Sequence, residues 1–190
     1  MTAKLKRGIT KVKDPGSALT HFIAMILAII AAIPLLSKAG HDSGHMRISA
    51  LAIFILSMIG LYAASTIYHT LDISPKINKL LRKIDHMMIF ILIAGTYTPV
   101  CMIVLGDKTG WTMLTLVWGI AIVGILINAL WITCPKWFSS LIYIAMGWVC
   151  ILAITKILSS MPRAGFMWLL AGGIIYTAGG IIYAMKLPFF

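Results

Sequence analysis

The sequence contains no glutamate, and its five acidic residues are all aspartates, against 16 lysines and arginines. Charged residues make up 11% of the 190 residues and hydrophobic residues 61%, whereas a soluble domain averages about 25% charged and about half apolar residues. This shortage of charge excludes an ordinary soluble domain and indicates an integral membrane protein. It also raises the question of why any aspartate is placed inside an apolar run.

Cysteine is also scarce. Cys101, Cys134 and Cys150 are far apart in the sequence and show no CxxC or CxxH spacing. Their number and spacing therefore argue against both a disulfide framework and a zinc site built from thiolates. We expect these side chains to pack as small apolar groups.

Long apolar runs, by contrast, are abundant. Six are long enough to cross a hydrocarbon core of about 30 Å, which takes about 20 residues. They cover roughly residues 17–37, 48–69, 85–105, 111–132, 139–158 and 165–186. The first is too long for a cleaved signal sequence, so we expect it to be retained. The connections are short, so we predict an all-α transmembrane bundle over residues 17–190, preceded by a basic arm over residues 1–16.

The basic residues are distributed unevenly between the two sides of the predicted bundle. The N-terminal arm and the connections on its side hold 11 lysines and arginines, and the other side holds 5. The positive-inside rule then places the N-terminus in the cytoplasm, and we expect a multi-pass protein of the cell's inner (plasma) membrane. The excess of positive charge is explained by topology and by membrane lipids as partners, and needs no nucleic acid.

Four local features carry structural expectations. Ser74-Pro75 starts a helix, and Ile77, Leu80, Leu81 and Ile84 predict that the segment before span three is an amphipathic helix in the membrane interface. The repeat AGGIIY, at residues 171–176 and 178–183, brings Gly173 and Gly180 to one face, where a neighbouring helix can approach closely. Pro99 should kink span three, and Asn128 should form a hydrogen bond between helices.

Polar side chains converge at one depth on the N-terminal side of the predicted bundle. Ser65 and His69 lie one helical turn apart at the end of span two. Asp85 lies at the start of span three and His21 near the start of span one. An ionisable group at membrane depth costs a few kcal/mol on insertion scales, so such a cluster indicates function.

Imidazole and carboxylate groups are typical zinc ligands, and a catalytic zinc keeps three protein ligands and a water. We therefore take His69 and Asp85 as candidate metal ligands, with Ser65 and Asp85 as candidate catalytic residues. The alternative is that these side chains simply lie at the level of the lipid headgroups. His86 points to another face than Asp85, and His41 and His45 lie in a loop on the other side, so all three rank lower.

Three segments, DPGSALTHF, STIYHTL and RKIDHMMIFILIAGTYTPV, together resemble the bacterial hemolysin III family, from about residue 14 to the end of the chain. That family is related to the progestin and adipoQ receptors and, more distantly, to the alkaline ceramidases. The resemblance implies a seven-helix bundle with a cytoplasmic N-terminus and a zinc ion near the cytoplasmic face. It makes His69 a zinc ligand, while Ser65 and Asp85 hold or activate a water.

The family also carries a His-x-x-x-His pair in a seventh span, which supplies two further zinc ligands. This sequence stops at Phe190, and His41 and His45, which have that spacing, lie in the opposite loop. We expect either a truncated chain or a six-span member with an incomplete site. Three functions remain open: a zinc-dependent hydrolase of lipid amide or ester bonds, a pore-forming or cytolytic protein, and a non-catalytic homeostasis or sensor protein.

Overall fold

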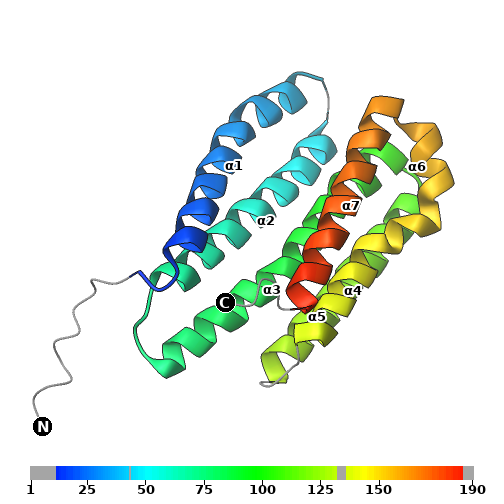
Figure 1. The fold of residues 1–190 in the computed structure, drawn as a ribbon. Helices are drawn as coiled ribbons and strands as arrows, with labels where there is room; N and C mark the ends of the chain where they lie inside the picture. The colour runs from blue at the N-terminus through cyan, green and yellow to red at the C-terminus, as the bar shows by residue number, and fades with distance from the viewer. Residues whose placement is uncertain (1–11, 43, 132–135, 186–190) are drawn as a thin grey trace, which may run out of the picture.

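The computed structural model describes residues 12–42, 44–131 and 136–185, and over these residues the chain is helical. The helices are α1 (Pro15–Asp42), α2 (His45–Thr70), α3 (Pro75–Pro99), η1 (Val100–Leu105), α4 (Lys108–Leu130), α5 (Lys136–Gly147), η2 (Trp148–Ala153), α6 (Ile154–Ser160) and α7 (Arg163–Ala184). η1 is a π-helix and η2 a 3-10 helix. Figure 1 shows α1 and α2 on one side of α3, and α4 to α7 on the other.

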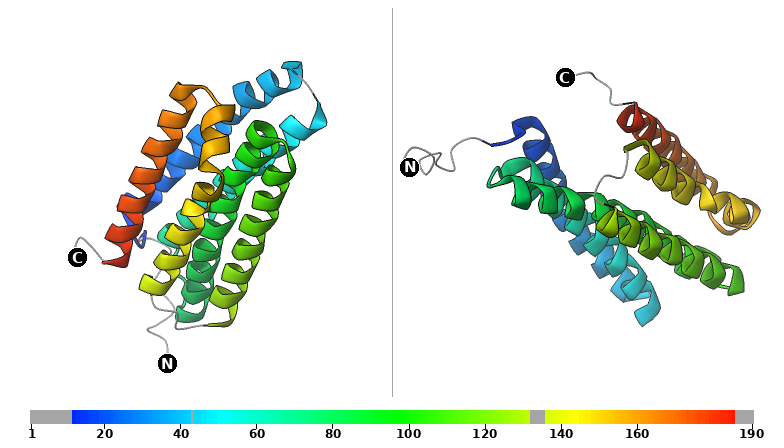
Figure 2. Two further views of the ribbon diagram at one scale, coloured as in Figure 1. Left: turned by 90° about the vertical axis from the view of Figure 1, so that its right-hand side faces the viewer. Right: turned by 90° about the horizontal axis from the view of Figure 1, so that it is seen from below.

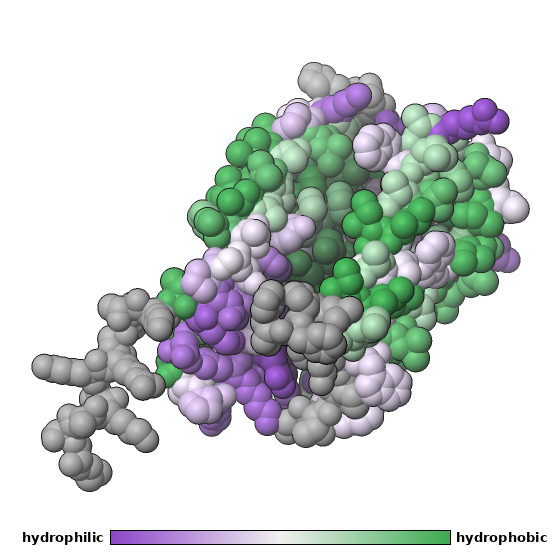
Figure 3. All heavy atoms as spheres, in the orientation of Figure 1, coloured by the Kyte–Doolittle hydropathy of each residue, from purple (hydrophilic) through white to green (hydrophobic). Residues whose placement is uncertain are grey.

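Six segments within the described residues are long and apolar enough to cross a membrane, as the sequence predicts. They are Pro15–Gly40, His45–Thr70, Pro75–Leu105, Lys108–Leu130, Trp137–Ser160 and Arg163–Ala184. Their outer surfaces are apolar: Ile33 is 68% exposed, Leu130 79% and Trp168 80%. Hydrophobic atoms cover most of the face seen in Figure 3, and hydrophilic ones gather at its ends. The fold is an all-α polytopic membrane bundle.

The helix ends follow local sequence signals. Ser74 Oγ accepts a hydrogen bond from Ile77 N (3.3 Å) with Pro75 at the first position of α3, as the Ser-Pro pair predicts. Asp107 Oδ1 accepts one from Gly110 N (3.0 Å) at the start of α4. η1 ends at Leu105, before the start of α4. It is followed by Gly106, whose φ of 59° is in the left-handed region that favours glycine.

The sequence predicts an amphipathic interfacial helix over residues 75–84, before span three. These residues are helical, but they form the first part of α3. α3 runs without a break from Pro75 to Pro99 and continues as η1 to Leu105. No glycine or proline lies between Lys76 and Ala94 to stop it. A helix of these 31 residues is about 46 Å long, more than the hydrocarbon core, so it must either tilt or extend beyond the core.

At Pro99, where the sequence predicts a kink, the helix changes type. The α-helix gives way to the wider π-helix directly after this proline. Close by, Thr98 Oγ1 donates to Ala94 O (3.0 Å) and accepts from Trp118 Nε1 (3.2 Å). The Thr98 hydroxyl thus links the α3 backbone to α4 just before the change of helix type.

The buried core lies where α3, α4 and α5 meet. Phe90 is fully buried, its ring 4.6 Å from that of Tyr143 of α5. On its other side the ring touches Gly124 of α4, where a side chain would collide with it. Asn128, one turn further along α4, donates to Gly124 O (3.2 Å) within its own helix. This intrahelical hydrogen bond replaces the interhelical one that we predicted for Asn128.

Two glycines of α7, Gly173 and Gly180, face η2 and α5. A Cβ on Gly180 would lie 2.9 Å from Ile144 Cδ1, and Gly173 comes nearest to Trp148. Thr177, between them, accepts a hydrogen bond from Trp148 Nε1 (2.9 Å). The small-residue face of the AGGIIY repeat therefore packs inside the bundle, as the sequence predicts. Figure 2 shows α5 and α7 lying side by side.

Four helix ends that matter for function lie at one end of the bundle. α1 and α3 begin there, and α2 and α7 end there (Figure 1). We call this the N-terminal end. The turn at Gly106 and Asp107 lies at the opposite end.

Candidate functional site

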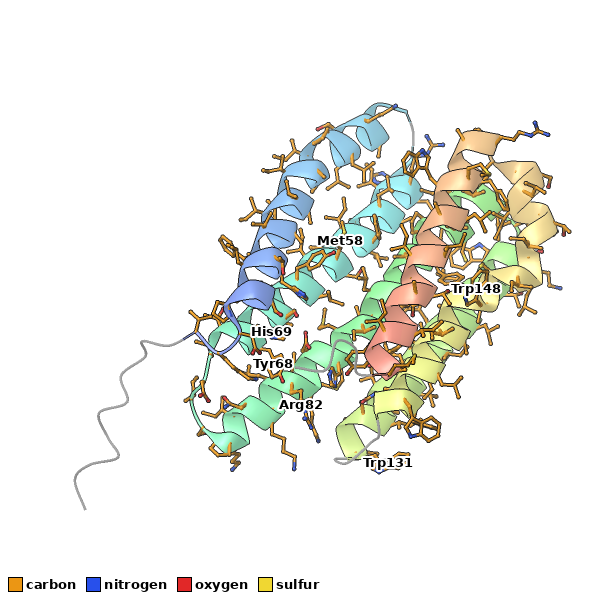
Figure 4. The ribbon with its side chains drawn as sticks, in the orientation of Figure 1. Met58, Tyr68, His69, Arg82, Trp131 and Trp148 are labelled. Carbon is orange, nitrogen blue, oxygen red and sulfur yellow. The ribbon has the colours of Figure 1, made fainter. Side chains whose placement is uncertain are left out.

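The predicted site residues Ser65, His69 and Asp85 all lie at the N-terminal end. Ser65 and His69 occupy the last two turns of α2, and Asp85 lies on α3, which packs against α2. Ser65 is 2% exposed, and His69 and Asp85 are half-buried. Figure 4 shows Tyr68 and His69 beside the start of α1, with Arg82 of α3 nearby.

His21 of α1 joins this group, because its ring centroid lies 5.7 Å from that of His69. It also makes an edge contact with Tyr62, at 5.9 Å between centroids. The Nδ1 atom of His21 is buried and has no hydrogen-bond partner among the described residues. A buried polar atom without a partner costs about 1–3 kcal/mol. This nitrogen can form one further hydrogen bond.

Asp14, directly before α1, is a member of the site that the sequence did not reveal. Its Oδ2 lies 2.9 Å from His69 Nδ1. Its backbone N donates to His69 O at the same distance of 2.9 Å. We had assigned Asp14 to a basic arm, although its position before the Pro15 helix start and its rarity as an acid were signals that could have singled it out.

Directly after Asp85, α3 makes a contact with α7. The next residue, His86, turns toward α7, where its Nε2 lies 3.1 Å from Tyr183 Oη. The prediction that His86 faces another direction from Asp85 agrees with this contact. This contact brings the last turns of α7 to the same end of α3 as Asp85.

The remaining candidates lie elsewhere. His45 is exposed at the first position of α2, at the opposite end of the bundle. The side chain of His41 and the whole of Cys134 lie outside the described residues. Cys101 and Cys150 are free thiols within the bundle, one buried and one half-buried.

The site offers imidazole nitrogens, a carboxylate and a hydroxyl at one depth. These groups suit the binding of a cation, the transfer of a proton and hydrogen bonding to a carbonyl oxygen. However, no three His, Cys, Asp or Glu side chains among the described residues lie close enough together to hold a metal ion. The donors match zinc in kind, but the described residues alone do not complete a zinc site.

An apolar cavity of about 410 Å³ begins one turn deeper, where Ile89 follows Asp85 and His86 on α3. Its walls come from α3, η2 and α7 and include Tyr97, Trp148, Phe166 and Tyr176. The hydroxyl of Tyr176 is buried there and has no hydrogen-bond partner within residues 12–42, 44–131 and 136–185. The cavity has the composition expected for a small-molecule site that takes an apolar group.

Comparison with known proteins gives a consistent result. The family model described as Haemolysin-III related matches residues 9–189. Hemolysin-3 of Bacillus cereus is 40% identical over 191 residues, covering 100% of this chain and 87% of that protein. The hemolysin-3 homolog of Bacillus subtilis (strain 168) is 37% identical over 178 residues, covering 93% of this chain and 83% of that protein. The family named in the sequence analysis is thereby confirmed.

Proposed function

Because the chain belongs to the haemolysin-III-related family, we propose that it is a membrane-embedded hydrolase that cleaves amide or ester bonds of lipids at the cytoplasmic face of the inner membrane. The observation that carries this proposal is the buried, unpartnered Nδ1 of His21, 5.7 Å between rings from His69. A buried nitrogen without a partner, beside a second imidazole and near a carboxylate, is a feature that packing alone does not explain.

The apolar cavity supports a lipid as substrate. It lies deeper in the bundle than the polar site, and its walls are mainly apolar side chains of α3, η2 and α7. A lipid with its polar group at the N-terminal end would extend its acyl chain in this direction. The amide or ester bond would then lie at the depth of Asp85 and Ser65.

Zinc is the cofactor that we propose, held by His69 and Asp85 with at least one further donor from outside the described residues. When bound, zinc brings the pKa of a coordinated water close to neutrality and polarises carbonyl groups. The chain's own residues have simpler roles. Asp85 would accept a proton from the attacking water, and the Ser65 hydroxyl, one turn from His69, would hydrogen-bond to the substrate carbonyl oxygen.

The metal can be tested by measuring the zinc content of the purified full chain in detergent. We expect His69→Ala to lose zinc and His45→Ala to keep it. His45 is a matched control because it is on the same helix but exposed at the opposite end. Equal zinc content in wild type and His69→Ala would overturn the role of His69, and absence of zinc from the wild type would overturn the cofactor.

Hydrolysis is tested separately, with fluorogenic lipid amides and esters in mixed micelles. We expect turnover by the wild type and a loss of at least 100-fold in Asp85→Asn, on the scale of general acid–base catalysis. Zinc binding without turnover of either lipid class would leave the non-catalytic homeostasis or sensor function and reject the hydrolase.

Cytolysis is the second candidate, favoured by the name hemolysin-3 of the two relatives. Six membrane-spanning segments argue against a soluble, secreted pore former. Purified protein added to red cells distinguishes the two functions. Lysis that is equal for wild type and His69→Ala, without lipid hydrolysis, would support cytolysis in place of the hydrolase.

A further inference from the structure

Two residues that lead into α1, Lys13 and Asp14, contact three consecutive residues at the end of α2. Lys13 Nζ lies 3.5 Å from the centroid of the Tyr68 ring. Asp14 N donates to His69 O (2.9 Å), and Lys13 N to Thr70 O (3.4 Å). The backbone bonds supply partners for carbonyls at the C-terminal end of a helix, which have none within the helix. They hold Asp14 beside His69 independently of its side chain.

The Asp14 side chain therefore adds something beyond attachment. Its Oδ2 lies 2.9 Å from His69 Nδ1. An ionised carboxylate can only accept, so Nδ1 carries the hydrogen of this bond. In a neutral imidazole the other nitrogen, Nε2, then has the free lone pair. That lone pair is what a metal or a transferred proton requires.

Stability does not explain this pair well. The side chain of Asp14 is 49% exposed and that of His69 21%. Exposed pairs of this kind contribute little, about 0–1 kcal/mol. A histidine that binds a metal, by contrast, almost always donates its second ring N–H to a carboxylate or carbonyl, which fixes its tautomer and ring orientation.

The other histidines at the N-terminal end have different surroundings. His86 Nε2 pairs with the hydroxyl of Tyr183, and His21 Nδ1 is the buried nitrogen without a partner. The hydrogen bond of the His69 ring, by contrast, is with a carboxylate.

We propose that Asp14 is a positioning residue for His69: its carboxylate holds the ring as the Nδ1–H tautomer and presents Nε2 to the site. The inference rests on the proposed function in one respect, namely that the site uses Nε2. The orientation itself does not depend on any bound metal and can be measured without one.

The test uses the full chain in detergent micelles and ¹⁵N NMR of the histidine rings, with the His69 signals assigned through His69→Ala. Wild type and Asp14→Glu should show neutral His69 protonated on Nδ1. Asp14→Ala should show a mixture or the Nε2–H form. Lys13→Ala is the matched control, because it removes the contact with Tyr68 and leaves the carboxylate, so its His69 signals should match the wild type.

Metal binding gives a second readout, with Co²⁺ titrated into the metal-free full chain. Asp14→Ala should bind 10–100-fold more weakly than wild type, the usual cost of losing such a partner, and Lys13→Ala should bind as wild type. Should Asp14→Ala not fold, Asp14→Leu, similar in size to aspartate, replaces it in both measurements.

An unchanged His69 tautomer in Asp14→Ala or Asp14→Leu overturns the inference. A changed tautomer supports it even where no protein in the series binds Co²⁺. In that last case the proposed metal cofactor fails while the positioning role stands, so the two failures are distinguishable.

Discussion

Asp107 lies at the opposite end of the bundle from the candidate site, in the turn between η1 and α4. Its Oδ2 accepts from Lys156 Nζ (2.7 Å) and its Oδ1 from Gly110 N (3.0 Å). These bonds lower the pKa of the Asp107 carboxyl from its ordinary value of 3.8 to about 2, and the bond from Lys156 has the largest effect. This aspartate thus joins the start of α4 to α6.

Because the pKa of Asp107 is lower in the folded protein, the contribution of this carboxylate to stability is fully present above about pH 4. It is lost as the pH falls through about 2. We expect Asp107→Asn to unfold at a lower temperature than wild type at pH 7, with the difference closing between pH 4 and pH 2. Thermal unfolding in detergent across this range measures it.

The control is the same substitution in a Lys156→Gln background. There the ion pair is already absent, so Asp107→Asn should change the unfolding temperature by less. A difference between wild type and Asp107→Asn that does not vary from pH 7 to pH 2 would contradict the assignment.

Single residues also show what the sequence could not reveal about the candidate site. Helix ends and alternation of spans were enough to bring Ser65, His69 and Asp85 to one end, since these positions depend only on span boundaries. The Asp14–His69 bond was not foreseeable in this way. It joins residues 55 apart in the sequence through the course of a short entry segment, and only the packing of α1 on α2 determines that course.

Helices in lipid gain little from hydrophobic burial and depend on close packing. α4 contains two glycines in contrasting places. Gly124 is buried, and a Cβ there would lie 2.5 Å from Cζ of the fully buried Phe90. Gly119 is exposed, and a Cβ there would meet nothing within 4 Å. The two glycines therefore report separately on packing and on helix propensity.

Gly124→Ala should destabilise the bundle by about 1–3 kcal/mol, because the added methyl overpacks the contact between α3 and α4. Gly119→Ala should instead raise stability by about 0.5–1 kcal/mol through higher helix propensity. Unfolding by denaturant in mixed micelles measures both. Equal effects of the two substitutions would mean that Phe90 moves aside freely, contrary to its burial.

At the level of elements, composition and run length predicted the six spans because lipid imposes a minimum helix length and forbids irregular backbone. Composition and run length did not predict that residues 75–84 would be continuous with span three in one helix, α3. The amphipathic pattern of that segment is compatible with a separate helix or with a protruding first part of a long one. The choice depends on whether the helix is interrupted after Ile84, and the sequence contains no residue there that requires an interruption.

The two ends of the bundle differ in their candidate functional groups and in the basic residues that the predicted topology assigns to them. The N-terminal end holds the candidate site, and the charge count assigns 11 lysines and arginines to its side against 5 on the other. A basic surface attracts the anionic lipids of the cytoplasmic leaflet. If that end faces the cytoplasm, the same charges that orient the chain also raise the local concentration of lipid headgroups at the mouth of the site.

The orientation can be tested with single cysteines introduced into a chain whose three cysteines are replaced by serine. Lys79 of α3 and Lys108 of α4 are both exposed lysines near helix starts, at opposite ends of the bundle. In intact cells a membrane-impermeant maleimide should label Lys108→Cys. It should label Lys79→Cys only after permeabilisation. The reverse pattern would place the N-terminal end outside the cell, because the reagent reaches only the outer face of intact cells, and would contradict the positive-inside prediction. The site would then meet the lipids of the outer leaflet, and the proposed substrate would have to be sought there.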